Sequence, residues 1–265
     1  MDKIWTIIRK EWSEVFKNRF VLFAVAFMPL LFTVIPLVIL HTMGGSADMN
    51  ELANDMDAIP NEYAPICGDL TGQDCAQYFI LSQFLILFLM MPIIIPVTIA
   101  SYSIVGEKTT RTLEPVLATP ITTIELLMGK AFAGVIPAMG VTWLSYGVFI
   151  IGTNILASGP KVTQQLFTPM WLLAIFVVGL LLSIAGVSLA VMISSRVNDP
   201  RVAEQLSSLV VLPLIGIFMA QSFGLIQVNQ TVIIWFALGL AILDALLLFF
   251  ATQLFQRETI LTRWK

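Results

Sequence analysis

Six long apolar runs decide what this chain can fold into. They cover residues 21–40, 78–105, 130–151, 170–194, 203–226 and 232–251. A helix that crosses a bilayer needs about 20 mainly apolar residues, because each residue advances about 1.5 Å through a hydrocarbon core about 30 Å thick. With 58% hydrophobic and 12% charged residues among 265, the chain has too little polar surface for a water-soluble domain. The sequence predicts an all-α membrane protein, a single domain over residues 1–265 with six transmembrane helices.

The positions of lysine and arginine predict the orientation of these helices, since cytoplasmic flanks carry an excess of both. With the N-terminus inside, 13 of the 14 basic residues fall on the inner side and only Lys161 falls outside. We therefore expect a multi-pass protein of the cell membrane with both termini in the cytoplasm. The first run is longer than the core of a secretory signal and is interpreted as a retained helix.

Residues 1–20 have apolar positions at helical spacing, with charged positions between them. The apolar positions are Ile4, Trp5, Ile8, Trp12, Val15 and Phe16. This pattern predicts an amphipathic helix that lies in the interface of the lipid bilayer, with its aromatic rings at headgroup depth. Such a helix either anchors the chain only or also transmits motion, and the pattern alone does not separate these two roles.

The loop predicted outside, residues 41–77, is acidic and contains no lysine or arginine. It carries both cysteines of the chain, Cys67 and Cys75, separated by seven residues. On an oxidising outer face this short spacing predicts a disulfide, with two unlinked thiols as the alternative. The acids lack the spacing of a zinc or calcium site, so they are interpreted as a solvated surface without a metal.

One acidic residue, Asp244, lies near the middle of the sixth run. A carboxylate there costs on the order of 2.5–3.5 kcal/mol by insertion scales, so it is expected to face protein or a wet cavity rather than lipid. It either lines the substrate path, where it could take up a proton or Na⁺, or is a structural carboxyl bonded to a neighbouring helix. Gln83 in the second run is a further candidate for a polar inner surface.

The segment between the second and third runs, residues 106–125, is unusually polar for its surroundings. Gly106 stands where a helix C-cap is expected, and Thr112 can cap a short helix that follows. One face of that short helix carries Leu113, Val116 and Leu117. Thr122 and Glu125 have the spacing of a capping box that starts the third spanning helix. The segment therefore predicts a small folded cytoplasmic surface with one apolar face.

The same segment resembles the most recognisable motif of ABC type-2 transporter permeases, an acid before a T-L-E-x-L-L-x-T-P core that is followed by Glu-Leu and Gly-Lys. The matching residues are Glu107, Thr112, Leu113, Glu114, Leu117, Thr119, Pro120, Ile121, Glu125, Leu126, Gly129 and Lys130. The layout of an amphipathic helix and six spans also agrees, whereas Arg111 stands where the family often has glycine. The resemblance implies that residues 106–125 hold the coupling helix, which docks on an ATP-hydrolysing subunit. The implied docking residues are Glu107, Arg111, Leu113, Glu114, Val116 and Leu117.

No Walker A pattern occurs, because Gly129 and Lys130 are followed by Ala131 and lack the upstream glycine. We therefore expect no cofactor on this chain, and the resemblance implies that ATP and Mg are bound by two copies of a partner ATPase. It also implies a homodimer, or a heterodimer with a related permease, that exports a substrate by alternating access. The chain would then be a transport subunit and not an enzyme, and no nucleic acid is indicated as a partner. An ion-coupled carrier or channel is the alternative, and an intramembrane enzyme is less favoured since H-E-x-x-H and G-x-S-x-G are absent.

Overall fold

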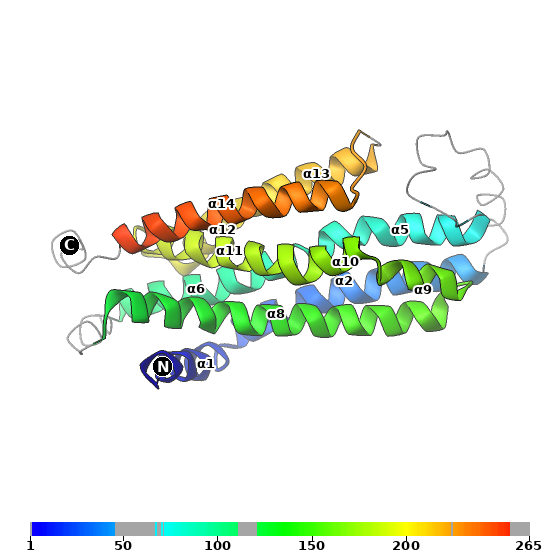
Figure 1. Ribbon diagram of the computed structural model, residues 1–265. Helices are drawn as coiled ribbons and strands as arrows, with labels where there is room; N and C mark the ends of the chain where they lie inside the picture. Colours follow the sequence, from blue (N-terminus) through cyan, green and yellow to red (C-terminus); the bar gives the residue numbers. More distant parts are fainter. Residues whose placement is uncertain are drawn as a thin grey trace.

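The structure is a computed structural model that describes residues 2–45, 67, 70, 72–110, 121–223 and 225–254. Its elements in these ranges are helical (Figure 1). They are α1 (Asp2–Val15), α2 (Arg19–Gly45), α5 (Gly72–Phe88), α6 (Met91–Thr109), α8 (Thr123–Leu156), α9 (Pro160–Leu166), α10 (Pro169–Leu172), the π-helical turn η1 (Leu173–Val178), α11 (Gly179–Ser194), α12 (Pro200–Ser207), the 3₁₀ turn η2 (Ser208–Val211), α13 (Leu212–Ser222) and α14 (Gln230–Leu254).

Six stretches of these helices are long and apolar enough to cross a membrane. They are Val21–Thr42, Gln73–Thr109, Ile124–Leu156, Pro169–Ser194, Pro200–Ser222 and Gln230–Ala251. They lie side by side in one elongated bundle (Figure 1). The prediction of an all-α membrane protein with six spans is therefore confirmed.

The helix ends differ from the predicted boundaries at two instructive places. The expected cap at Gly106 is wrong, because α6 continues through Gly106 to Thr109. The residues just after Gly106 stay helical since their charged side chains find partners inside the bundle, as described below. In the fifth span the helix ends at Ser222, so the described part of residues 223–226 lies in a turn toward α14 rather than in the span.

The start of the third span agrees with its sequence pattern. The backbone N–H of Glu125 donates to Thr122 Oγ1 at 3.2 Å, and the backbone N–H of Thr122 donates to Glu125 Oε2 at 2.8 Å. This reciprocal pair satisfies two N–H groups that have no partner inside the helix. The capping box predicted from the sequence is thus present at the point where α8 leaves the coupling segment.

Helix α6 occupies the centre of the bundle and packs against α11, α8 and α12. Trp171 on α10 is fully buried in the core. Its ring centroid lies 6.1 Å from that of Tyr146 and 6.0 Å from that of Phe149. In contrast, α13 and α14 expose large apolar side chains along their length, including Leu212, Trp235 and Ile242. Such faces suit contact with lipid or with another membrane-embedded subunit, because neither requires a polar surface.

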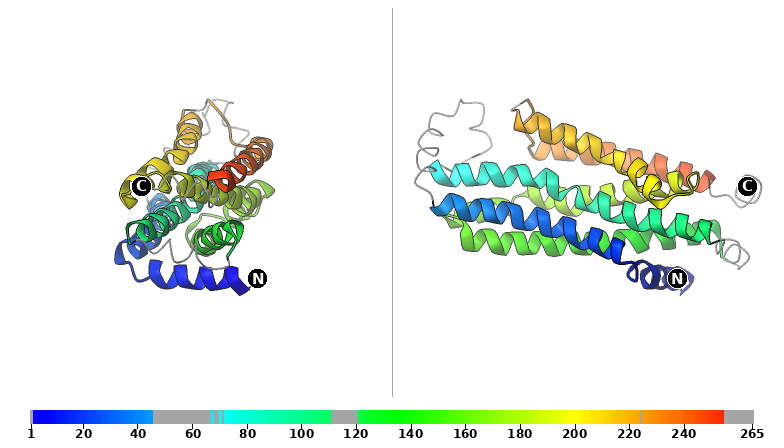
Figure 2. Two further views of the ribbon diagram at one scale, coloured as in Figure 1. Left: turned by 90° about the vertical axis from the view of Figure 1, so that its left-hand side faces the viewer. Right: turned by 180° about the vertical axis from the view of Figure 1, so that it is seen from behind.

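Helix α1 lies across the bundle rather than along it (Figure 2). The last turn of α6, the start of α8 and the end of α14 lie at the same end, which we call the α1 end of the bundle (Figure 1). The start of α5 and helix α9 lie at the opposite end. This arrangement is the one expected for an interfacial helix that precedes a set of spanning helices.

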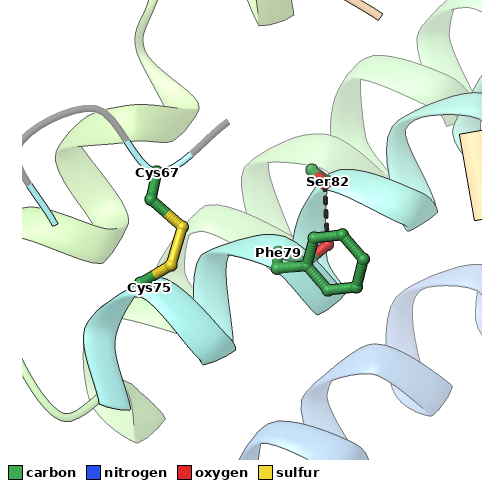
Figure 3. The surroundings of a disulfide bond; sticks show 4 residues. All are labelled: Cys67, Cys75, Phe79 and Ser82. Carbon is green, nitrogen blue, oxygen red and sulfur yellow. Dashed lines mark hydrogen bonds between the residues drawn. A yellow bond between two sulfur atoms is a disulfide. The ribbon is translucent and has the colours of Figure 1, made fainter. Parts of the chain in front are cut away.

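At that opposite end, Cys67 and Cys75 form a disulfide that joins residue 67 to the first turns of α5 (Figure 3). The Cα atoms of the two residues are 5.2 Å apart. Most of the predicted outer loop, 41–77, lies outside the described residues. The disulfide therefore ties the described end of that loop to the helical bundle.

We expect replacement of both cysteines by serine to lower the free energy of unfolding by about 2–3 kcal/mol, because a short closed loop restricts the unfolded chain. Mass spectrometry of non-reduced peptides should show residues 67 and 75 in one linked pair, and thermal unfolding of the double variant should start at a lower temperature. Two free thiols in the membrane-extracted protein would contradict the assignment.

Candidate functional site at the α1 end of the bundle

A buried cluster of paired charges lies where α1, α6 and α8 meet. Lys130 on α8 is only 3% exposed, and its Nζ lies 2.8 Å from Glu11 Oε1 on α1 and 2.8 Å from Glu107 Oε2 on α6. The same ammonium group donates to Ser103 Oγ at 2.7 Å. Lys10 on α1 donates to the other carboxylate oxygen of Glu107. We call these residues, Lys10, Glu11, Glu107 and Lys130, the charge cluster.

Burial explains why Glu11, Glu107 and Lys130 must be paired, whereas Lys10 is partly exposed at the edge of the cluster. An isolated ion loses several kcal/mol of solvation when it leaves water, and only close opposite charges with good hydrogen bonds offset that loss. Glu11 and Glu107 are 2% and 5% exposed, so each carboxylate depends on its lysines. Because the partners come from three different helices, the cluster holds those helices in one relative position.

The pKa shifts of Lys10 and Glu11 follow from this geometry. For Lys10, burial opposes the charged form, but the hydrogen bond and charge of Glu107, with Glu11 and Glu14 nearby, raise its pKa above the ordinary value. For Glu11, burial again opposes the charge, but Lys130 outweighs it and lowers the pKa. A lowered carboxyl pKa gives stability that is present above its ordinary value and lost in acid, whereas a raised lysine pKa gives stability that is lost in strong base. Lys10 and Glu11 are therefore both charged near neutral pH, where their ion pairs contribute stability.

Two further contacts dock α1 on α8. A Cβ at Gly129 would lie 2.7 Å from the side chain of Ile7, so only glycine allows α1 to approach this closely. Trp12 Nε1 donates to the backbone carbonyl of Ala133 at 3.0 Å. That carbonyl has no helical N–H donor because the residue four positions later is Pro137. The apolar face of α1 therefore rests on α8 and not only on the membrane interface.

The charge cluster brackets the predicted coupling segment. Glu107 is the second residue of the segment and Lys130 lies just after its end, so the two ends of the segment are joined to each other and to Glu11 of α1. Lys108 also connects the segment to α11. Its Nζ donates to the backbone carbonyls of Ser195 and Val197, just after the end of α11, at 3.2 Å each. A force on the segment would consequently reach α1, α6, α8 and α11 together.

The structure places the predicted docking residues in two groups. Glu107 is buried in the charge cluster, and its role in docking is not tested by this position. The other five lie outside the described residues. They are Arg111, Leu113, Glu114, Val116 and Leu117. Their role in binding an ATPase stays a prediction.

The two predicted pathway residues lie on helices that contribute nothing to the charge cluster. Asp244 on α14 is 5% exposed, and neither of its carboxylate oxygens has a hydrogen-bond partner among the described residues. Gln83 on α5 is partly buried and its Oε1 accepts a long hydrogen bond of 3.5 Å from Ser222. Asp244 thus points away from lipid, and the pathway role of both residues stays a prediction.

Sequence reasoning missed two residues that matter here. Glu11 was not considered, although it follows Ile8 by three residues and precedes Val15 by four, which places it on the apolar face of the first helix. A charge on such a face is a signal for a buried partner. Glu204 near the start of the fifth span was not considered, and it accepts a hydrogen bond of 2.6 Å from Thr98.

The described residues contain no group of three or more histidine, cysteine, aspartate or glutamate side chains that could hold a metal ion. Six helices that can span a membrane and a transverse first helix (Figure 2) define the class as a multi-pass membrane protein. The family model described as "ABC-2 family transporter protein" matches residues 5–256. The match includes nearly the whole chain, and the chain belongs to this family. Among curated proteins, none matches it significantly.

Proposed function

We propose that this chain is the transmembrane permease subunit of an ABC exporter, and that a separate ATPase subunit drives it. The observation that carries the proposal is the charge cluster, which fastens both ends of the coupling segment to the helices that must move. Membership of the ABC-2 transporter family supports the same assignment. The predicted Leu113, Val116 and Leu117 face would insert into a groove of the ATPase, where its apolar area is removed from water.

The mechanism follows from how the segment is held. Two ATPase subunits that close on ATP and Mg would push on the coupling segments of two permease chains. Because Glu107 and Lys130 fix the segment to α6, α8 and α1, the push would displace these helices as one body and open a cavity to alternate sides. In this mechanism α1 transmits motion in addition to anchoring the chain.

The orientation and the assembly belong to the same proposal. The α1 end of the bundle would face the cytoplasm of the cell, since the other basic residues of the described chain gather there and only Lys161 among them lies in α9 at the opposite end (Figure 1). The exposed apolar side chains of α13 and α14 would be covered by lipid and by a second permease, identical or related.

The experiment that tests this function compares the chain alone with the chain expressed beside a Walker A ATPase from the same gene cluster. We expect no ATP hydrolysis by the isolated chain, which lacks a Walker A loop, and a stable complex that hydrolyses ATP after co-expression. The matched control replaces the Walker A lysine of the ATPase, which should leave the complex assembled but inactive.

Two outcomes would contradict the proposal. Hydrolysis by the isolated chain would show a nucleotide site that the sequence does not contain. Transport into vesicles that continues without ATP but requires a proton or Na⁺ gradient would favour the ion-coupled carrier, for which the buried Asp244 is the specific supporting observation.

A further inference from the structure

A cavity of about 490 Å³ opens between α2, α6, α12 and α13. Its volume lies within the range of about 300–1,000 Å³ that is typical of sites for small molecules. Most of its wall is apolar, formed by Met28, Ile94, Val97, Leu209, Leu212 and Ile215. The cavity lies at the level of the spanning helices, so it suits a ligand whose body is apolar.

A single ionisable side chain, Glu204, stands among the described residues that line this cavity. Its Oε1 accepts a hydrogen bond of 2.6 Å from Thr98 Oγ1, and Thr98 is 1% exposed. Arg201 lies one turn earlier on α12 but does not line the cavity, and its side chain bonds to Tyr102. Within the described part of the chain, Glu204 has no ion-pair partner. The cavity therefore presents one fixed carboxylate, oriented by a threonine, to whatever enters it.

The combination of an apolar wall and one unpaired carboxylate selects a ligand by charge. A neutral apolar ligand would strip water from the carboxylate and give it no partner, and an anion would be repelled in addition. A cation with an apolar body would bury its body against the wall and neutralise the carboxylate. Glu204 lies only about one turn inside the fifth span, at the α1 end of the bundle, where such a ligand could enter from the inner leaflet.

We propose that this cavity binds amphipathic organic cations and that such compounds are the substrate class of the transporter. The second part of this statement rests on the exporter function proposed above, whereas the binding itself does not. Glu204 recognises the cationic group, Thr98 positions the carboxylate, and the apolar side chains of α6 and α13 hold the body of the ligand.

The test measures binding of radiolabelled tetraphenylphosphonium to the purified full chain by equilibrium dialysis in detergent. Tetraphenylborate has nearly the same size and shape but carries a negative charge, so it separates recognition of charge from apolar partitioning. We expect the wild-type chain to bind the phosphonium and not the borate above the detergent background. The variant Glu204→Gln should bind the phosphonium at least about tenfold more weakly, because it loses one charge pair in a partly buried site.

Two further variants keep the test decisive. Leu209→Trp fills the cavity without changing its charge and should also abolish binding of the phosphonium. Asp74→Asn removes one negative charge at the opposite end of the bundle, where an amide oxygen can still accept the hydrogen bond of Ser158, and should bind like wild type. Thermal unfolding of all three variants at the wild-type temperature shows that each is folded, and Glu204→Ser replaces Glu204→Gln if the latter unfolds early.

Several results would overturn the proposal. Equal binding of the phosphonium by wild type and Glu204→Gln would show that the carboxylate does not recognise it. Absence of phosphonium binding by the folded wild-type chain, both before and after bound lipid is removed, would also overturn it. The binding test uses no ATPase. If the chain binds the phosphonium but forms no active complex with the ATPase, only the exporter function is rejected. If the active complex forms but the chain does not bind the phosphonium, only this site is rejected.

Discussion

Replacement of Lys130 by methionine is expected to lower the free energy of unfolding by about 3–5 kcal/mol, the usual effect of removing one partner of a buried ion pair. Methionine fills a similar volume but leaves Glu11 and Glu107 buried with their closest shared cation removed. In a chain of this size the loss corresponds to a fall of roughly 10 °C in Tm. Thermal unfolding of the purified protein, followed by tryptophan fluorescence, measures it.

A second substitution distinguishes a lost charge pair from simple loss of packing. Lys130→Met leaves the buried carboxylate of Glu11 without its closest cation. The double variant Lys130→Met with Glu11→Gln removes that carboxylate as well, so it should recover part of the lost stability. Lys161→Met is the matched control, because Lys161 is exposed at the start of α9 and its loss should change Tm very little. A double variant as unstable as the sum of its two single variants would show that Glu11 and Lys130 are not coupled.

The spans could be predicted from the sequence because their signal is local. Length and apolar composition within one run determine whether a helix can cross a bilayer, and six runs gave six spans. The Thr122 and Glu125 capping box is local in the same sense and was also predicted correctly. The end of α6 was predicted too early, at Gly106, because glycine is a common helix C-cap. The helix continues to Thr109 since Glu107 and Lys108 have partners far away in the sequence.

The charge cluster could not be predicted for the same reason. Lys130 and Glu11 are 119 positions apart in the sequence, and no spacing rule joins a residue of an interfacial helix to one of a later span. The motif that resembles the ABC type-2 permeases named Glu107 and Lys130 but gave no contact between them. Only the packing of α1 across α8, which requires Gly129, brings the four charges together.

The fifth span shows a different kind of omission. Glu204 was present in the predicted run, but a charge near the end of a span is usually explained by its access to water. Its importance depends on Thr98 of α6, which lies opposite and supplies a hydroxyl donor. A carboxylate beside an apolar cavity becomes visible only when both helices are placed, so the sequence favoured Asp244 as the acid of interest.

Replacement of Leu113 and Leu117 by aspartate should abolish binding of the ATPase and with it transport. The two side chains form the apolar face of the predicted coupling helix, and a charge on each would be buried without a partner in the groove of the ATPase. Co-purification with the tagged ATPase measures binding, and uptake into inverted vesicles measures transport. Because the charge cluster fixes the segment from both sides without using these leucines, the variant should keep the thermal stability of wild type.

The control places the same charge on an exposed apolar position that the coupling segment does not include. Leu225 is 77% exposed in the turn between α13 and α14, at the opposite end of the bundle, and Leu225→Asp should bind the ATPase normally. If the Leu113 and Leu117 variant still binds the ATPase and transports at the wild-type rate, the coupling role is wrong. If it instead unfolds at a lower temperature, the leucines pack on the permease itself, and the ATPase must contact another surface at the α1 end.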